Sequence, residues 1–249
     1  MLRVGICGVC GKMGKKIASL AVADPKINLC AALERPDSPD VGKDIGPLIG
    51  VDEIGVKVTS KLEEACDRID CFIDFTLPES TVNNAEMYSS RGISLVIGTT
   101  GLSGEAEEKV REAAKTIPIV FAPNMSAGVN VFFKLIEDAA KILCPEFNVK
   151  IDETHHVHKK DSPSGTAKKI GQILSEISGV YPMIEAFREG EVVGNHGVIF
   201  ESKYETIEIR HDAKSRDVFA AGAIKAAKFL SGKAPGLYSM FDVLGISSE

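Results

Sequence analysis

The chain has 249 residues, enough for one large domain or two smaller ones, and its 44% hydrophobic and 26% charged residues are typical of a globular protein. Its formal net charge is −6, and its Lys and Arg residues are spread along the chain. We therefore expect no nucleic acid partner, because binding to phosphates needs a dense positive face. The sequence has neither a signal-peptide pattern nor an apolar run of roughly 20 residues, so we also expect no membrane partner and a cytoplasmic location.

The first half of the chain alternates short apolar runs with longer amphipathic ones. Strand-length runs rich in β-branched residues occupy residues 2–7, 27–34, 70–75, 93–99 and 117–122. Helix-length stretches lie between several of them, at 12–23, 78–90 and 103–115. This α/β alternation predicts a Rossmann-like, doubly wound parallel sheet.

After about residue 127 the rhythm changes. The pattern predicts a long helix at 127–144, a polar strand at 147–157, a helix opening at "PSGTAKKIGQIL", two strands near 196–212 and a last helix, "DVFAAGAIKAAKFLSG". We expect a first domain at 1–126, onto which residues 217–249 pack back. A second, α+β domain with a mixed sheet is expected at 127–216.

The cysteines lie mostly inside strand-like or helix-like stretches of a chain too large to need disulfides, so we expect reduced thiols. They are Cys7, Cys10, Cys30, Cys66, Cys71 and Cys144. Cys7 and Cys10 form a C-x-x-C, but it lies among glycines, unlike a redox pair that opens a helix. We expect neither redox nor metal chemistry from it.

The motif "GVCGKMG" stands between the first predicted strand and the first helix and contains Gly8, Gly11 and Gly14. Glycines there permit a tight turn and let a pyrophosphate approach the helix N-terminus. The spacing is G-x-x-G-x-x-G, where the usual fingerprint is G-x-G-x-x-G, and a turn can need glycine for steric reasons alone. The strand-turn-helix context favours a dinucleotide site.

Glu34 ends the second predicted strand, twenty residues after Gly14, and Arg35 follows it. An acid at this place usually accepts hydrogen bonds from the adenosine ribose. An adjacent arginine can pair with a 2′-phosphate and stack on adenine. The pair predicts a pocket that accepts NADH or NADPH; the simpler alternative is a solvated Glu-Arg pair.

Two more strand ends, "VIGTTG" and "FAPNMS", are expected on the same edge of the sheet, where ligands of open α/β sheets bind. Their candidate cofactor residues are Gly98, Thr99, Thr100, Ala122, Pro123, Asn124 and Met125. Either segment can also be a plain strand-to-helix turn, with Ser103 and Ser126 as N-caps.

The stretch "ETHHVHKKDSPSGTAKK", residues 153–169, holds three of the five histidines and four lysines. In a strand, His156 and His158 would share one face and His155 would take the other. His-x-His can chelate zinc, but Lys159 and Lys160 would repel a cation, so we expect no metal. Solvated polar strand residues are the other alternative.

An anion site explains this composition better. With Ser164 as N-cap, the amides of Gly165 and Thr166 and the Thr166 hydroxyl would form a carboxylate cradle. Histidine titrates near neutral pH and suits acid/base catalysis, worth about 10²- to 10⁴-fold in rate. A small dicarboxylate is the expected substrate.

Together, "HHVHKKDSPSGTA", "GVCGKMG", "GTTG", "APNMSAGVNV" and the C-terminal "SGKAPGLYSMFDVLG" resemble the dihydrodipicolinate reductase family over essentially the whole chain. The resemblance implies reduction of 4-hydroxy-tetrahydrodipicolinate to tetrahydrodipicolinate with NADH or NADPH, in lysine and diaminopimelate biosynthesis. It also implies a homotetramer built through the second domain. The chain departs from the family at Lys12, commonly arginine, and at Ser162, commonly alanine.

The resemblance further implies a role for each site residue. His155 is the acid/base residue and Lys159 the proton donor, while His156 and the backbone at Gly165 and Thr166 hold substrate carboxylates. Cofactor contacts come from Glu34, Arg35, the two strand ends named above and Gly8, Val9, Cys10, Gly11, Lys12 and Met13. Rival functions are another NAD(P)-dependent oxidoreductase of a small acid, a non-catalytic dinucleotide sensor and a zinc-binding regulatory module.

Overall fold

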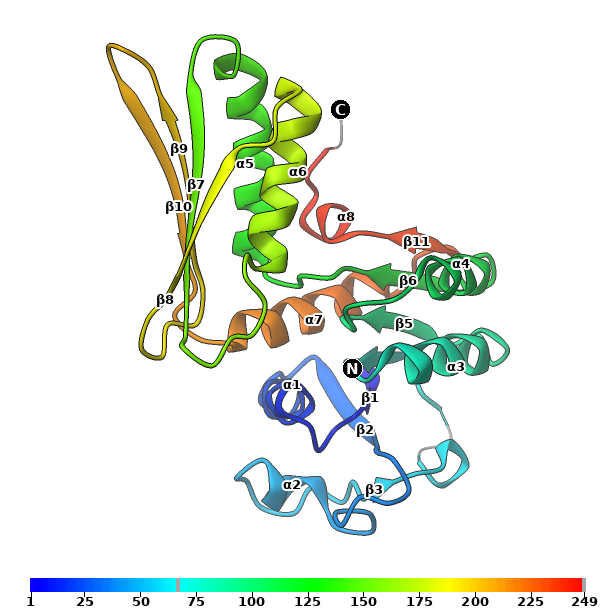
Figure 1. Cartoon of the computed structure of the whole chain (residues 1–249). Coiled ribbons are helices and arrows are strands. Elements are labelled where there is room, and N and C mark those ends of the chain that lie inside the picture. Colours follow the sequence, from blue (N-terminus) through cyan, green and yellow to red (C-terminus); the bar gives the residue numbers. More distant parts are fainter. Residues whose placement is uncertain (66–67, 248–249) are drawn as a thin grey trace. The chain divides into compact units, whose positions relative to one another are not determined.

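The computed structural model describes residues 1–65 and 68–247 (Figure 1). These residues divide into two compact units. The first consists of Met1–Met125 and the described chain from Phe219 onward, and the second is Ser126–Val218. Among the described residues, no helix is both long enough and apolar enough to cross a membrane.

The first unit is built on a seven-stranded sheet in the order β11-β6-β5-β4-β1-β2-β3. Its strands are β1 (Leu2–Cys7), β2 (Ile27–Leu33), β3 (Val58–Thr59), β4 (Cys71–Asp74), β5 (Ser94–Ile97), β6 (Pro118–Phe121) and β11 (Gly236–Tyr238). Every neighbouring pair is parallel. The predicted doubly wound sheet is confirmed. Its strand order reverses at β1, where a crevice forms outside the carboxyl ends of the strands.

Helices cover both faces of this sheet (Figure 1). The described helices of this unit are α1 (Lys12–Ala23), α2 (Ile45–Leu48), the 3₁₀ helix η1 (Leu62–Glu64), α3 (Pro78–Ser89), α4 (Gly104–Ala113), α7 (Asp217–Leu230) and α8 (Met240–Leu244). One buried cluster joins residues of α1, α7 and α8 to Val4 and Ile6, and a second joins α3 and α4 to Phe72. Two buried faces explain why these strands read as continuous apolar runs.

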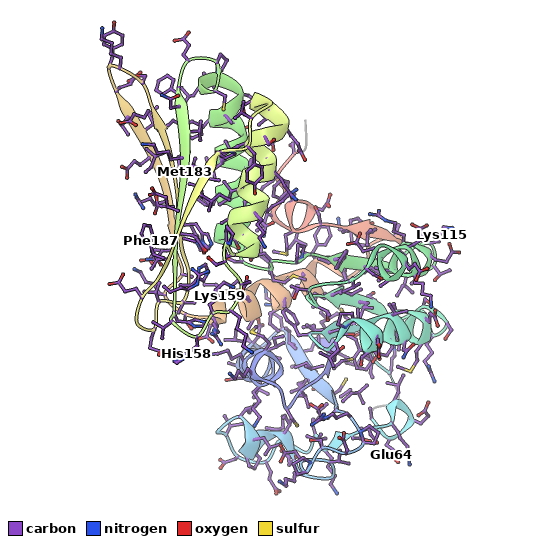
Figure 2. The ribbon with its side chains drawn as sticks, viewed as in Figure 1. Glu64, Lys115, His158, Lys159, Met183 and Phe187 are labelled. Atoms are coloured by element: carbon purple, nitrogen blue, oxygen red, sulfur yellow. The ribbon has the colours of Figure 1, made fainter. Side chains whose placement is uncertain are left out.

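The second unit contains a four-stranded sheet in the order β10-β9-β7-β8. Its strands are β7 (Asn148–His155), β8 (Met183–Arg188), β9 (Asn195–Glu201) and β10 (Thr206–Asp212). β7 pairs with β8 in parallel, whereas the other pairs are antiparallel, which confirms the predicted mixed sheet. Two helices, α5 (Ala127–Leu143) and α6 (Gly165–Ser178), lie along one face of it (Figure 1). Met183 and Phe187 of β8 are 56% and 51% exposed (Figure 2).

One expectation about the histidine-rich stretch is wrong. β7 ends at His155, so His156 and His158 do not lie on a strand face. The chain turns at this point because the amide of Lys159 donates to the carbonyl oxygen of His156, while Glu189 donates to the carbonyl of His155. The three histidines therefore differ in environment: His155 is buried, His156 half-buried and His158 exposed.

Candidate functional site

Each of the three glycines in the turn after β1 has a different role. Gly8 has a φ of 71°, which favours glycine. Gly11 is the N-cap of α1, and no side chain caps that end of the helix. A Cβ on Gly14 would overlap the carbonyl oxygen of Gly8. Glycine at position 14 therefore allows α1 to approach the end of β1 closely. The N-terminus of α1 is thus left without a capping side chain, which favours an anion at this end of the helix.

Glu34 is tied to this turn. Its Oε2 accepts a hydrogen bond from the backbone N–H of Cys10, at 2.9 Å. Its Oε1 accepts the backbone N–H of Arg35, at 3.1 Å. The Arg35 side chain is 72% exposed and pairs with Asp37 at 3.3 Å. An exposed ion pair of this kind is weak, so the guanidinium can leave it to meet a ligand.

A cavity of about 600 Å³ brings the cofactor candidates of this region together. Gly8, Gly11, Glu34 and Arg35 all line it, together with Thr76 at the end of β4. Within the described chain, the strand-end groups at 98–100 and 122–125 do not line this cavity. The geometry therefore joins the glycine turn to the Glu-Arg pair, all within the first unit.

A buried carboxylate, Asp74, connects the cavity wall to the "GTTG" segment. Its Oδ1 accepts hydrogen bonds from the backbone and hydroxyl of Thr76, at 2.8 and 2.6 Å, and lies 3.5 Å from the Thr99 hydroxyl. Its Oδ2 accepts from Asn84 at 2.8 Å, and Thr81 donates to Thr99 at 2.8 Å. Burial raises the pKa of Asp74, which these donors oppose. Asp74 fixes the loops after β4 and β5 relative to each other.

The remaining cofactor candidates differ in exposure. Val9 and Met125 are buried in the core of the first unit, so their side chains face the apolar cluster and only their backbones can meet a ligand. Lys12 and Thr100 are exposed. Asn124 is half-buried. Ser103 and Ser126 cap α4 and α5, as the alternative of plain strand-to-helix turns expects.

The thiols near the glycine turn are poor nucleophiles and poor metal ligands. Burial raises the pKa of Cys7 well above its usual value, and burial together with the charge of Glu34 raises that of Cys10 to about 11. Both groups are therefore protonated at neutral pH. The described cysteines form no disulfide with one another, and Cys66 lies outside the described residues.

In the second unit, the "SPSG" segment leads into α6 as predicted. Ser164 is the N-cap, and its Oγ accepts the backbone N–H of Ala167 at 3.1 Å. Gly165 and Thr166 form the first turn of the helix, which carries the positive end of the helix dipole. This end of α6 is held by a fully buried acid, since the backbone N–H of Ser164 donates to Glu153 Oε1 at 3.1 Å.

Glu153 is also the centre of a cluster that contains His155. Its Oε2 is in close contact with His155 Nδ1, although the two atoms do not align as a conventional hydrogen bond. Both terminal nitrogens of Arg188 lie 3.2 Å from Oε1. His196 lies on the next strand, with Nε2 3.1 Å from the Ser164 hydroxyl and its ring edge-on to that of His155.

Electrostatics keep both buried histidines neutral at neutral pH. Burial lowers the pKa of His155; the Glu153 charge opposes this shift, and the charges of Lys159 and Arg188 reinforce it. Burial, followed by the proximity of His155, lowers the pKa of His196 to about 3. Neutral imidazole beside a lysine is an arrangement that can exchange a proton with a bound ligand.

The other predicted residues of the segment lie around this cluster. His156 Nε2 is 3.1 Å from a terminal nitrogen of Arg216. Lys159 Nζ pairs with Asp161 at 2.8 Å, and its side chain is 22% exposed. Figure 2 shows Lys159 and His158 in the segment that follows β7. The exposed His158 is 3.6 Å from Glu191 and takes no part in the buried cluster.

Three residues of the cluster are close enough for a metal ion to bridge them. Glu153, His155 and His196 each offer one ligand atom within 4.8 Å of the others. This trio differs from the His-x-His pair considered from the sequence. The Arg188 guanidinium lies 3.2 Å from the other oxygen of this carboxylate, Oε1, and its charge opposes a cation there. The donor set fits a proton-handling cluster better than a metal centre.

Four residues that shape these sites were not predicted: Asp74, Glu153, Arg188 and His196. Glu153 stands in the quoted stretch, two positions before His155, so strand periodicity was the signal that puts both on one buried face. Arg188 and His196 come from β8 and β9, and only strand pairing brings them to β7.

Comparison with known proteins decides the family. The family model described as "Dihydrodipicolinate reductase, N-terminus" matches residues 2–125, and the corresponding C-terminus model matches residues 128–244. The chain belongs to the dihydrodipicolinate reductase family. Proteins named 4-hydroxy-tetrahydrodipicolinate reductase from Anaeromyxobacter dehalogenans (strain 2CP-C) and Methylococcus capsulatus are both 42% identical to it. They cover 99% of this chain, which in turn covers 98% and 99% of theirs.

Solved structures show the same fold. A dipicolinate-bound dihydrodipicolinate reductase from Paenisporosarcina sp. TG-14 matches with a TM-score of 0.80 at 23% identity, covering 97% of this chain and 98% of its own. Diaminopimelate dehydrogenase of C. glutamicum matches with a TM-score of 0.59 at 13% identity, covering 100% and 96%. The dihydrodipicolinate reductase family is a family of oxidoreductases, and the resemblance predicted from the motifs is confirmed.

The low pKa of His196 predicts how the stability of this family member depends on pH. The folded pKa of about 3 lies below the ordinary 6.5, so below that value the unfolded chain binds a proton that the folded chain excludes. The free energy of unfolding should therefore fall by about 1.4 kcal/mol per pH unit from this group, between pH 6.5 and 3. Urea unfolding of His196→Asn should show a shallower loss between pH 6.5 and 4 than wild type. Equal slopes of unfolding free energy against pH in the two proteins would contradict the low pKa of His196. The difference between their unfolding free energies at pH 8 reports the change in packing alone.

Proposed function

We propose that the chain reduces 4-hydroxy-tetrahydrodipicolinate to tetrahydrodipicolinate, with a nicotinamide dinucleotide bound by the first unit and the substrate bound by the second. This is the activity in the names of relatives that are 42% identical over nearly the full chain. The observation that supports it best is the buried Glu153–His155 pair beside Lys159 and the N-terminus of α6. A dinucleotide-binding domain at 1–126 with 217–249, and a substrate domain at 127–216, correspond to this division of labour.

The first unit fits a dinucleotide. The uncapped N-terminus of α1 at Gly11 would hold the pyrophosphate, and Glu34 and Arg35 would meet the adenosine end in the adjoining cavity. Further contacts would come from Val9, Cys10, Lys12 and Met13, from Gly98, Thr99 and Thr100, and from Ala122, Pro123, Asn124 and Met125. When bound, the nicotinamide supplies a hydride. Because Glu34 suits NADH and Arg35 suits NADPH, both cofactors should be accepted.

The second unit supplies carboxylate binding and protons. The N-terminal turn of α6 at Gly165 and Thr166, together with His156, would hold the carboxylates, and dipicolinate, the ligand of the related Paenisporosarcina enzyme, is such a dicarboxylate. Reduction consumes one hydride and one proton, after the 4-hydroxyl leaves as water. Lys159 would donate the proton to the anion left by hydride addition, while His155 handles the acid/base work nearby.

The setting of the activity is proposed as well. We expect a homotetramer in the cytoplasm, with no nucleic acid or membrane partner and no metal requirement. The exposed Met183 and Phe187 on β8 support assembly through the second unit, because large apolar side chains on a strand favour protein contact.

The activity is tested by following NADPH oxidation with substrate generated by the preceding synthase reaction. Wild-type protein should consume NADPH only when substrate is present, and metal analysis should find no stoichiometric zinc. Cofactor binding without turnover would instead favour the dinucleotide sensor. Turnover of a different small acid alone would favour another oxidoreductase, and stoichiometric zinc without turnover would favour the regulatory module.

Arg35→Ala should weaken NADPH binding much more than NADH binding, because only NADPH carries the 2′-phosphate. Losing a charged contact costs about 1.5 to 3 kcal/mol, or roughly 10- to 150-fold in Kd. Titration calorimetry with both cofactors measures the ratio. Arg111→Ala, an exposed arginine on α4, is the matched control and should change neither Kd. Equal losses for the two cofactors would remove Arg35 from the phosphate site.

Lys159→Arg separates proton donation from positive charge. Arginine keeps the charge but is effectively never deprotonated, so it can attract a carboxylate without readily giving up a proton. We expect Lys159→Ala and His155→Ala to lower kcat by about 10²-fold or more, with little change in NADPH affinity. Lys159→Arg should stay nearly as slow as Lys159→Ala while partly recovering substrate KM.

The exposed neighbour Lys160 provides the control, because Lys160→Arg should leave both kcat and KM at wild-type values. Recovery of kcat in Lys159→Arg would mean that Lys159 acts by charge alone, and the proton-donor role would then be withdrawn.

A further inference from the structure

Glu153 lies where three elements of the second unit converge. Its side chain has no exposed surface. Oε1 accepts the backbone N–H of Ser164, at 3.1 Å, and is 3.2 Å from both terminal nitrogens of Arg188. Because Ser164 is the N-cap of α6 and Arg188 ends the edge strand β8, this single oxygen ties the helix N-terminus and β8 to β7.

The other carboxylate oxygen faces two histidine rings. Oε2 contacts Nδ1 of His155 and lies 4.0 Å from Nε2 of His196. An anion at Nδ1 favours the tautomer that carries its proton there, so Nε2 of His155 keeps the lone pair. That side of the ring faces Gly194, where a Cβ would lie only 2.9 Å from Nε2. Glycine at position 194 therefore leaves space beside Nε2 of His155.

We propose that Glu153 is a positioning residue for both halves of the substrate site: it orients His155 through Oε2 and anchors the N-terminus of α6 through Oε1. The inference rests on the proposed function, because it assigns Glu153 its role through the acid/base residue and the carboxylate cradle of that reaction. This positioning role requires a carboxylate, because one side chain must accept a hydrogen bond at Oε1 and carry negative charge at Oε2.

The surroundings keep Glu153 ionised despite its burial. Burial by itself raises the pKa of a carboxyl group, but the N–H of Ser164 and the charges of His155 and Arg188 more than offset this, and the pKa of Glu153 lies below its usual value. These contacts therefore favour the charged form of the carboxylate. Its charge raises the pKa of His155, against burial and the charges of Lys159 and Arg188.

Glu153→Gln is the test, because the amide keeps the size and an acceptor for Ser164 but removes the charge. Its NH₂ group facing Nδ1 would favour the opposite tautomer of His155, with the proton on Nε2. We expect kcat to fall about 10²- to 10⁴-fold, the range seen when an acid/base histidine is lost or held in the wrong tautomer. Substrate KM and the Kd for dipicolinate should change less than about threefold, since the amide oxygen still holds the helix N-terminus.

The pH profile of kcat/KM provides a readout that a purely structural role would not move. The charged and titratable groups facing His155 are Glu153, Lys159, Arg188, His196 and Asp161. Removing the negative charge of Glu153 leaves the cationic ones less opposed, so the pKa of His155 falls. The limb of the profile that reports His155 should therefore move to lower pH in Glu153→Gln.

Two further variants keep the test decisive. Glu176→Gln makes the same change at an exposed position of α6 and should leave kcat, KM and the profile unchanged. Glu153→Asp keeps the charge but shortens the side chain, so kcat should fall at least tenfold while the His155 limb stays in place. If thermal melting shows that Glu153→Gln does not fold, Glu153→Asp decides the question.

The results of these experiments distinguish failure of the positioning role from failure of the proposed function. No turnover by wild-type protein would overturn the proposed function itself. In an active wild-type enzyme, wild-type kcat in Glu153→Gln or Glu153→Asp would overturn the positioning role alone. So would equal losses in kcat and dipicolinate affinity with an unmoved pH limb, because they would mean that Glu153 only holds the fold.

Discussion

The second unit depends on one buried charge, the Glu153 carboxylate. A charge removed from water is tolerated only when it is paired and hydrogen-bonded, and removing one partner of such a pair typically costs 3 to 5 kcal/mol. Glu153 satisfies this through Ser164 on α6 and Arg188 on β8. The same requirement that stabilises the carboxylate therefore sets where α6 begins and where His155 is held. Stability and site geometry have one origin here.

The two candidate sites use helix N-termini in different ways. α1 begins at Gly11 with no capping side chain, so its first turn stays available to a phosphate. α6 begins at Ser164, whose Oγ takes up the Ala167 amide while Glu153 takes up that of Ser164. In the proposed function, a carboxylate at α6 would therefore meet a helix end whose first N–H groups are partly hydrogen-bonded, whereas a pyrophosphate at α1 would meet an end without a capping side chain. The two helix ends differ because the N-cap residue is glycine in α1 and serine in α6.

Sequence periodicity predicts what is local and misses what is long-range. The runs at 2–7 and 12–23 match β1 and α1 because a strand and a helix each carry their own pattern. β8 was missed, since "MIEAFR" alternates exposed and half-buried positions without a clear apolar face. The Glu153 cluster was missed for a related reason: Arg188 and His196 reach it only through the pairing of β8 and β9 with β7. The sequence therefore identifies the titratable residues of the 153–169 stretch, but it does not identify the residues of β8 and β9 that influence their protonation.

The cationic stretch of this acidic chain is less positive than its composition indicates. Arg188 is already neutralised by Glu153, and Lys159 by Asp161. The two pairs differ in the burial of the acid, because the Glu153 side chain has no exposed surface whereas that of Asp161 is 52% exposed. A pair with an exposed acid is worth about 0 to 1 kcal/mol, so in the proposed function a dicarboxylate would displace Asp161 from Lys159 at little cost, while Arg188 would remain paired with the buried Glu153. The cluster therefore contains one cation that holds it together, Arg188 of β8, and one that is available to a ligand, Lys159 of the cationic stretch.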